Sequence, residues 1–293
     1  MTAWLTRLMD AQGAWVRPLG DVVHSVLHRV FHAIPSVRDL LNGRWLGHPV
    51  HPAITDLPIG ILGLVIVFDV IGQGFAADVA LLLGVLAMTG AAVAGFADYA
   101  DTDGKPRERA TLHSALMSVA LVLYLVSLLL RYPQGTAGAA AFWLSVLAWL
   151  IVLAGAYVGG DVVYALGNMV SRHAFRGGGT KWILLEPAEV DAEGSIPEGR
   201  PIKAKLGINT LVLVRDGPRI LALHDTCAHA GGPLSGGLLI DGAVECPWHG
   251  SRFRVGDGHV VQGPSVYDQP AYEVRPREGG GWEARRSSEQ AGS

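Results

Sequence analysis

Four long apolar segments constrain the fold of this 293-residue chain more than any other feature. Each holds about 18–22 residues, which is the length a helix needs to cross a hydrocarbon core of ~30 Å. Glycine, proline and charged residues interrupt the apolar sequence between them. The segments cover residues 54–71, 76–97, 112–130 and 139–158. We therefore predict an all-α four-helix transmembrane bundle over residues 48–175, rather than the buried bundle of a soluble protein.

The distribution of basic residues predicts which way the bundle is oriented. Four crossings place the N-terminus, the loop between the second and third spans, and everything after the fourth span on one side. Eleven basic residues flank the spans on that side, against Arg131 alone on the other: Arg7, Arg17, Arg29, Arg38, Arg44, Lys105, Arg107, Arg109, Arg172, Arg176 and Lys181. By the positive-inside rule we expect a multi-pass protein of a bacterial cytoplasmic (inner) membrane, with both termini cytoplasmic. The first 25 residues show no signal for cleavage.

Residues 1–47 form a segment that is amphipathic rather than spanning. Its apolar face comprises Val22, Val23, Val26, Leu27, Val30 and Phe31 at helical spacing, which suits a helix lying in the membrane interface. His24, His28 and His32 form a stripe on another face. Three histidines at this spacing can hold a metal, but no carboxylate or cysteine on the stripe completes a ligand set. We therefore expect a solvated polar face.

Ionisable residues within or beside the spans form a second group of candidates. They are Asp56, Asp69, Asp98, His113 and Asp161, with His48 and His51 just before the first span. All but Asp69 are expected near the cytoplasmic ends. Such residues are costly in a bilayer and are a default functional hypothesis. Two interpretations remain: helix caps and ion pairs that hold the bundle together, or a site for haem, a metal or a quinone.

The membrane half resembles a known family. His48-Pro-Val-His51-Pro, followed by Asp56-Leu-Pro58-Ile-Gly60, is similar to the signature of a bacterial four-helix membrane domain of unknown function. The stretches Gly95-Phe-Ala-Asp98-Tyr99 and Gly159-Gly-Asp161 also fit that family. The resemblance covers roughly residues 43–175 and implies no activity.

A second, all-β domain is predicted over residues 182–283, after a glycine-rich linker at 176–181 and before a disordered tail at 284–293. Short strands are expected at 182–185, 211–214, 220–223, 243–246, 259–261 and 272–275. The sequences around Asp216-Gly217 and Asp241-Gly242 predict hairpin turns, because Asp-Gly readily adopts the left-handed conformation that such turns need.

Two loops of this domain carry four metal-ligating side chains. The first reads Cys227-Ala-His229 and the second Cys246-Pro-Trp-His249, with sixteen residues between the two motifs. Two thiolates and two imidazoles suit a structural zinc. They also suit a [2Fe–2S] cluster with the thiolates on one iron and the imidazoles on the other. Each loop supplies one cysteine and one histidine, an order that favours the cluster over a zinc finger.

This half resembles a Rieske [2Fe–2S] ferredoxin-type domain. The resemblance implies that Cys227, His229, Cys246 and His249 bind the cluster, and that Gly231, Pro233, Gly250 and Pro264 shape its surroundings. Respiratory relatives have an additional disulfide whose positions correspond to Gly232 and Trp248, and a tyrosine where this chain has Phe253; Ser251 is retained. We therefore expect a reduction potential toward the lower part of the Rieske range of roughly −150 to +300 mV. The missing disulfide also fits a reducing cytoplasm.

These features predict a membrane-tethered iron–sulfur protein that transfers single electrons between a reductase or quinone and a redox partner. It would be an electron carrier or oxidoreductase component rather than a stand-alone enzyme. The alternatives are a redox protein whose bundle binds haem or quinone near His48, His51 and His113, and a redox sensor without turnover. We expect no catalytic domain of the Rieske oxygenase kind. A net charge of −3 gives no indication of the basic surface that nucleic-acid binding usually requires.

Overall fold

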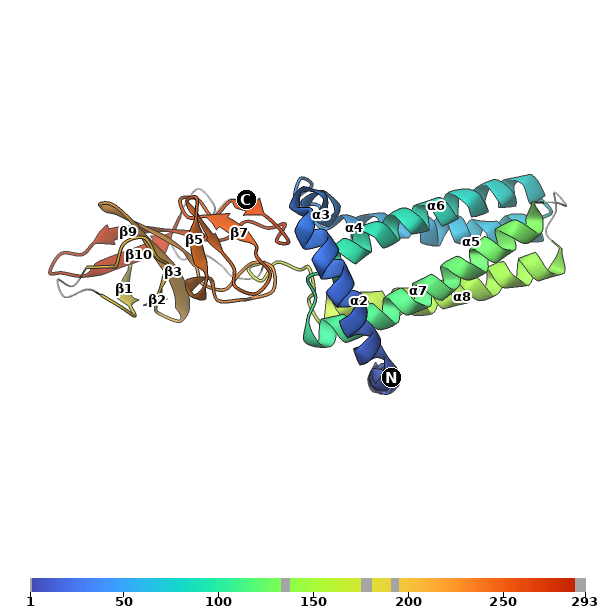
Figure 1. Cartoon of the computed structure of the whole chain (residues 1–293), viewed down its shortest axis with the longest axis horizontal. Coiled ribbons are helices and arrows are strands. Elements are labelled where there is room, and N and C mark those ends of the chain that lie inside the picture. Colours follow the sequence, from blue (N-terminus) through green and yellow to red (C-terminus); the bar gives the residue numbers. More distant parts are fainter. Residues whose placement is uncertain (1, 133–137, 175–180, 191–194, 288–293) are drawn as a thin grey trace. The chain divides into compact units, whose positions relative to one another are not determined.

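The computed structural model describes residues 2–132, 138–174, 181–190 and 195–287, and it divides into two compact units (Figure 1). The helical unit comprises Met1–Asn42 and Pro49–Asn168. The barrel unit comprises Gly43–His48 and Met169–Ser293. Each unit is described separately below.

Within its described residues, the helical unit has eight α-helices and a short π-helical turn. The elements are α1 (Thr2–Asp10), α2 (Gly13–Ala33), α3 (Pro35–Asn42), α4 (Val50–Ile54), α5 (Asp56–Val70), α6 (Gly74–Tyr99), α7 (Gly104–Arg131), α8 (Ala139–Gly160) and η1 (Asp161–Ala165). Among the described residues, four spans are long and apolar enough to cross a membrane: Val50–Val70, Gly74–Tyr99, Gly104–Arg131 and Ala139–Ala165. The predicted four-helix transmembrane bundle is confirmed, with each span somewhat longer than its apolar core.

Small residues let the spanning helices approach closely. At Gly84 of α6, an added Cβ would lie 2.5 Å from a methyl group of Leu62 on α5, so a larger residue would force the helices apart. Leu62, Leu81, Ala120 and Ala148 are fully buried in the centre of the bundle. Many larger apolar side chains are instead exposed on its outside, as expected of a surface that faces lipid.

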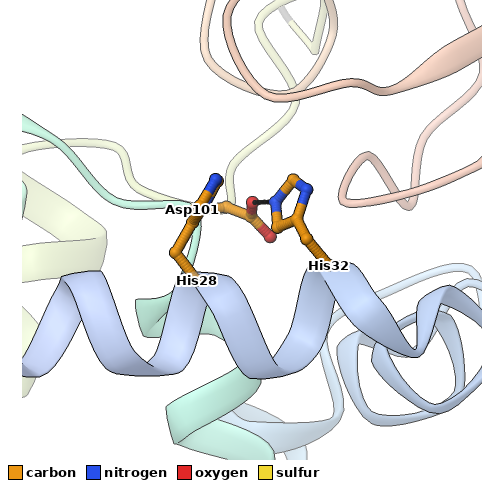
Figure 2. Close-up of side chains that lie close together, drawn as sticks. All are labelled: His28, His32 and Asp101. Atoms are coloured by element: carbon orange, nitrogen blue, oxygen red, sulfur yellow. Dashed lines mark hydrogen bonds and ion pairs between the residues drawn. The ribbon is translucent and has the colours of Figure 1, made fainter.

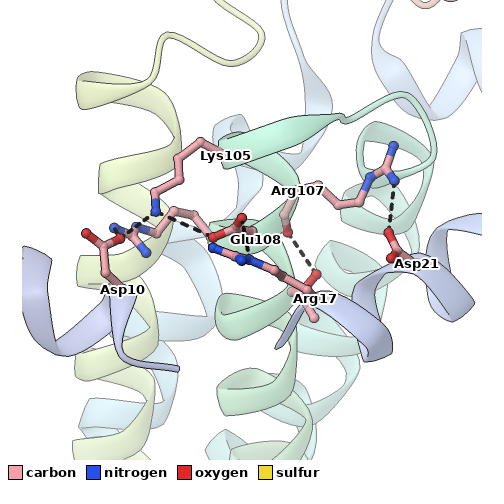
Figure 3. A network of polar contacts seen from close by, with 8 residues as sticks. Asp10, Arg17, Asp21, Lys105, Arg107 and Glu108 are labelled. Atoms are coloured by element: carbon pink, nitrogen blue, oxygen red, sulfur yellow. Dashed lines mark hydrogen bonds and ion pairs between the residues drawn. The ribbon is translucent and has the colours of Figure 1, made fainter. Parts of the chain in front are cut away.

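The N-terminal segment folds into α1–α3, and ion pairs connect α1 and α2 to the start of α7 (Figure 3). Lys105 contacts Asp10 at 2.6 Å, and Arg17 contacts Glu108 at 2.9 Å. Val22, Val26 and Val30 of α2 stay exposed. Phe31 of the same predicted apolar face is buried, and Leu27 packs with it against Ala97 of α6. The helix is therefore amphipathic as predicted, but the helical unit covers part of its apolar face.

The part of the barrel unit that the structure describes contains ten strands. A closed barrel has the order β1-β10-β9-β4-β3-β2, and a smaller sheet has the order β5-β6-β7-β8. The strands are β1 (Ile183–Pro187), β2 (Ile202–Leu206), β3 (Asn209–Asp216), β4 (Arg219–His224), β5 (Leu238–Ile240), β6 (Ala243–Glu245), β7 (Arg252–Arg254), β8 (Val260–Gln262), β9 (Ala271–Pro276) and β10 (Trp282–Arg286). The all-β prediction is confirmed and six strands lie where expected. Strands β2, β5, β7 and β10 were not predicted.

Two boundaries differ from the expected ones. Strand β10 continues to Arg286, beyond the expected start of the tail at 284, because Ala284 is buried and Arg285 pairs with Glu273 on β9. The chain joins the barrel unit at Met169 rather than near residue 176, because Tyr267 donates a hydrogen bond to the Met169 carbonyl. Most of the expected linker and the end of the tail lie outside the described residues.

Candidate functional site

The four predicted ligands lie on two loops of the barrel unit. Cys227 and His229 follow β4, and Cys246 and His249 connect β6 to β7. Cys227 and Cys246 are buried, as is His229, whereas His249 is half-exposed. The two imidazole rings lie 5.0 Å apart between centroids and almost perpendicular, at 88°. The fold therefore brings all four together, although 21 residues lie between the first and the last.

The two loops have the same backbone geometry. The N–H of each cysteine donates to a carbonyl five residues later, at 2.8 Å in both loops: Gly232 for Cys227 and Ser251 for Cys246. The carbonyl of each cysteine accepts the N–H of a glycine four residues later, Gly231 or Gly250. Both glycines have positive φ, 91° and 76°, a conformation that other residues rarely adopt. The sequence Cys-x-x-x-Gly thus encodes one tight turn twice.

These turns direct backbone N–H groups at the sulfur atoms. Cys227 accepts from the amides of His229 and Ala230, and Cys246 from those of Trp248 and His249. The two thiols also hydrogen-bond to each other. This contact, assisted by the Trp248 and His249 amides, lowers the pKa of Cys246 to about 7, whereas it and burial raise the pKa of Cys227. Aligned N–H donors stabilise the thiolate form that metal binding requires.

Gly232 and Trp248 occupy the two positions that correspond to the additional disulfide of respiratory Rieske proteins. The ring of Trp248 lies against Gly232, where an added Cβ would come within 2.9 Å of both the ring and the Cys246 sulfur. A bulky side chain in one loop therefore packs on the bare backbone of the other. Both cysteines of the chain are free thiols, in agreement with the absence of this disulfide.

The arrangement fits a two-iron cluster better than one zinc ion. A single zinc has ligands about 2.0–2.3 Å away, so its ligand atoms lie within roughly 4 Å of one another. Among the described residues, these four side chains supply no set of three ligand atoms within 4.8 Å of one another. Two neighbouring sulfurs and two imidazoles that do not join them in one compact set instead match a cluster in which the cysteines bind one iron and the histidines bind the other.

Ser251 and Phe253 lie beside the cysteines and are fully buried. The Ser251 hydroxyl oxygen accepts the Ser265 N–H at 3.0 Å, which leaves its own hydrogen able to donate elsewhere. Phe253 packs in the same core as Cys227 and Cys246 and has no hydroxyl to offer. Pro264 follows a cis peptide bond and is buried.

Gln269 is a supporting residue that the sequence analysis missed. It is fully buried beneath the first loop. Its side-chain oxygen accepts the Ala228 N–H at 2.9 Å, and its amide nitrogen donates to the carbonyls of His224 and Thr226. It therefore fixes the backbone on both sides of Cys227. A single glutamine forms no recognisable sequence motif. Its role becomes visible only in the folded domain, where the pairing of β9 with β4 brings Gln269 next to the first loop.

His173 also contacts this loop, from the segment that follows the last span. It donates from Nε2 to the Thr226 carbonyl at 2.8 Å, and its ring packs 4.7 Å from that of His224. The Arg172 N–H donates to the Ala228 carbonyl. The segment between the fourth span and the linker is thus part of the support of the candidate site.

Most ionisable residues of the spans form ion pairs. Arg131 is buried and contacts Asp69 through two hydrogen bonds, at 2.9 and 2.5 Å, and Asp78 at 3.2 Å. Arg109 contacts Asp161 at 3.0 Å. The structural interpretation therefore holds for Asp69 and Asp161.

Three other span candidates are not brought together. Asp98 is buried with one carboxylate oxygen lacking a hydrogen-bond partner, whereas Asp56 is exposed. His48 belongs to the barrel unit. His51 and His113 do meet inside the bundle, with ring centroids 6.0 Å apart.

The histidine stripe of α2 is not the solvated face that we expected. His28 and His32 lie beside buried Asp101, in the turn after α6, with one ligand atom from each residue within 4.8 Å of the others (Figure 2). The carboxylate missing from the stripe thus comes from another element. However, buried Arg38 donates to His32 Nε2 at 3.1 Å and lies 3.8 Å from the Asp101 carboxylate, which places a fixed positive charge at the cluster. We describe the cluster as an ion-pair network and assign no metal to it.

Comparisons with known proteins agree with this two-part organisation. Residues 186–273 match the Rieske [2Fe-2S] domain family, and residues 47–172 match a family described as predicted membrane protein (DUF2231). Ferredoxin CarAc of Metapseudomonas resinovorans is 35% identical over 75 residues, which cover 26% of this chain and 70% of the ferredoxin. The anthranilate 1,2-dioxygenase ferredoxin subunit of Burkholderia cepacia is 29% identical over 96 residues, 33% of this chain and 89% of the subunit.

Other relatives share only a small part of their length. Apoptosis-inducing factor 3 of Homo sapiens is 32% identical over 80 residues, 27% of this chain, and the match spans 13% of that protein. Among solved structures, the ferredoxin of carbazole 1,9a-dioxygenase from Nocardioides aromaticivorans is 28% identical, with a TM-score of 0.29. That match covers 35% of this chain and 97% of the ferredoxin.

Proposed function

The chain belongs to the Rieske [2Fe-2S] family through residues 186–273, and from this premise we propose which residues bind the cluster and what it serves. One iron is bound by the two cysteines and the other by the two histidines: Cys227 with Cys246, and His229 with His249. The observation that carries this proposal is the repeated turn, which buries both sulfurs and directs two amide N–H groups at each. The bound cluster supplies one-electron redox chemistry.

The protein acts as a membrane-tethered electron carrier at the cytoplasmic face of the bacterial inner membrane. Two ferredoxins among its relatives support the role of carrier, and the four spans support the tether. His249 is the more exposed of the two histidines and offers the route for an electron to leave. The tether raises the local concentration of the carrier near membrane partners without a tight interface. The donor is a reductase or a quinone, and the acceptor is a redox protein.

Low-temperature electron paramagnetic resonance of the dithionite-reduced protein, purified in detergent, tests this function. We expect a rhombic Rieske-type signal, two irons and two acid-labile sulfides per chain, and a one-electron redox titration. Cys227→Ser should abolish the signal, whereas Ile208→Ser, in an exposed turn of the same domain, should retain it. A sample with stoichiometric zinc and no sulfide would refute the carrier.

A further inference from the structure

His51 and His113 form a pair inside the helical unit that the iron–sulfur site does not use. His51 lies on α4 and His113 on α7, and their rings approach to 6.0 Å between centroids with planes inclined at 76°. Each ring makes the same contact with a backbone carbonyl of the membrane span that follows its own. His51 Nδ1 is 2.8 Å from the Ala91 carbonyl on α6, and His113 Nδ1 is 2.8 Å from the Gly155 carbonyl on α8.

The surroundings of the two rings repeat as well. A glycine follows each carbonyl four residues later, Gly95 after Ala91 and Gly159 after Gly155. At both glycines an added Cβ would come within 2.9 Å of the ring, at Nδ1 of His51 or His113. The missing side chains let each ring lie against a helix backbone. The two imidazoles are thus held in the same way, one between α4 and α6 and the other between α7 and α8.

The carbonyl contacts determine which nitrogen of each ring carries the proton. A backbone carbonyl only accepts, so each neutral ring donates from Nδ1 and leaves a lone pair on Nε2. In a metal-ligating histidine, the ring nitrogen that does not bind the metal usually donates its N–H to an acceptor in this way. A quinone carbonyl, in contrast, needs an N–H donor, and these rings have already used theirs. The pair is therefore built to bind a metal rather than a quinone.

The number of ligands identifies the kind of metal centre. In the described residues, no third His, Cys, Asp or Glu completes a compact set with this pair. Protein sites for bare zinc use three or four side chains. Haem iron needs only two axial ligands, because the porphyrin supplies the other four. A metal about 2 Å from the Nε2 of each ring puts the two ring centroids roughly 6 Å apart, as they are here.

We propose that the bundle binds one haem whose iron is ligated axially by Nε2 of His51 and Nε2 of His113. Both histidines are half-buried in the helical unit, His51 on α4 and His113 on α7, and side chains from neighbouring helices of a bundle commonly hold cofactors. Gly95 and Gly159 position the rings. The chain then carries a second one-electron centre in its membrane half, in addition to the iron–sulfur cluster.

Titration of the detergent-purified chain with haemin tests the proposal. We expect saturation at one haem per chain, a low-spin spectrum with two imidazole ligands, and three irons for every two acid-labile sulfides. His51→Ala and His113→Ala should each convert the haem to a high-spin form and weaken its binding at least tenfold. Acid-labile sulfide should be unchanged, so that the result is independent of the iron–sulfur cluster.

Glycine variants separate a ligand role from a merely structural one. Gly95→Ala and Gly159→Ala should disturb the rings and shift the haem spectrum. Gly90→Ala, on α6 but with no atom within 4 Å of the added methyl group, should leave it unchanged. The absence of saturable haemin binding, low-spin haem retained in both histidine variants, or stoichiometric zinc or copper in place of haem would each overturn the proposal.

Discussion

At the scale of single residues, Ser251 provides a test of how the chain sets its reduction potential. Its buried hydroxyl lies on the second cluster loop, and the position two residues later is occupied by Phe253. If the hydroxyl donates to a cluster sulfur, Ser251→Ala should lower the potential by roughly 60–130 mV, the equivalent of one hydrogen bond to a charged group. The measurement is a redox titration. A less stable protein with an unchanged potential would mean that Ser251 only supports Ser265.

Gly232 allows a second test at this scale, because it has a matched control. An added methyl group would lie 2.9 Å from the Cys246 sulfur, so Gly232→Ala should lower cluster occupancy, measured as acid-labile sulfide per chain. Gly256 lies in the same domain with open space around it, and Gly256→Ala should have no effect. Equal cluster occupancy in the two variants would show that the loop accommodates the methyl group and that the close approach at Gly232 is not needed for cluster binding.

Gln269 contributes through the three hydrogen bonds of its side chain to the first loop. Gln269→Leu leaves the buried Ala228 N–H without its acceptor, which costs about 1–3 kcal/mol of stability. We expect faster loss of the visible absorption of the cluster on heating. Gln262→Leu removes a single, longer contact of 3.3 Å to the other loop and should have a smaller effect. The reverse order would contradict the role of Gln269.

At the scale of elements, the buried Arg131 network joins the C-terminal ends of α5 and α7 to the start of α6. Removing one partner of a buried ion pair leaves an uncompensated charge and costs about 3–5 kcal/mol. Arg131→Leu should therefore lower the free energy of unfolding of the bundle by that amount, measured by denaturant titration in mixed micelles. The double variant Arg131→Leu/Asp69→Leu should recover most of the loss. No recovery would indicate that Asp78 is the important partner.

The helices, strands and loops also differ in how well the amino-acid sequence alone predicts them. The four spans and the two cysteine loops could be predicted because long apolar segments and ligand spacing are local signals. Strands β7 and β10 were missed because they are rich in charge, and they depend on cross-strand pairs such as Arg252 with Glu245. The same holds for Asp101 beside His28 and His32. Its place depends on packing between α2 and the α6–α7 turn, which no local pattern encodes.

At the scale of the whole molecule, the basic residues used to predict orientation have a further role. Lys105, Arg107 and Arg109 each form an ion pair with an acidic residue of the helical unit. Arg131, the one basic residue assigned to the opposite side, is buried rather than exposed in a loop. Arg38 and Arg109 on the other side are buried as well, so the expectation of a cytoplasmic barrel unit continues to rest on the count of basic residues in the sequence.

Cysteine labelling tests this orientation, because both native cysteines are buried and proposed to bind the cluster. Gln73 lies in the exposed turn between α5 and α6, and Ile208 is fully exposed between β2 and β3. In intact cells, a membrane-impermeant maleimide should label Gln73→Cys after access to the periplasm. Ile208→Cys should react only after lysis, with the parent chain as the unlabelled control. The opposite pattern would place the iron–sulfur domain outside the cytoplasm, where its partners would differ, and would show that the positive-inside rule fails for this chain.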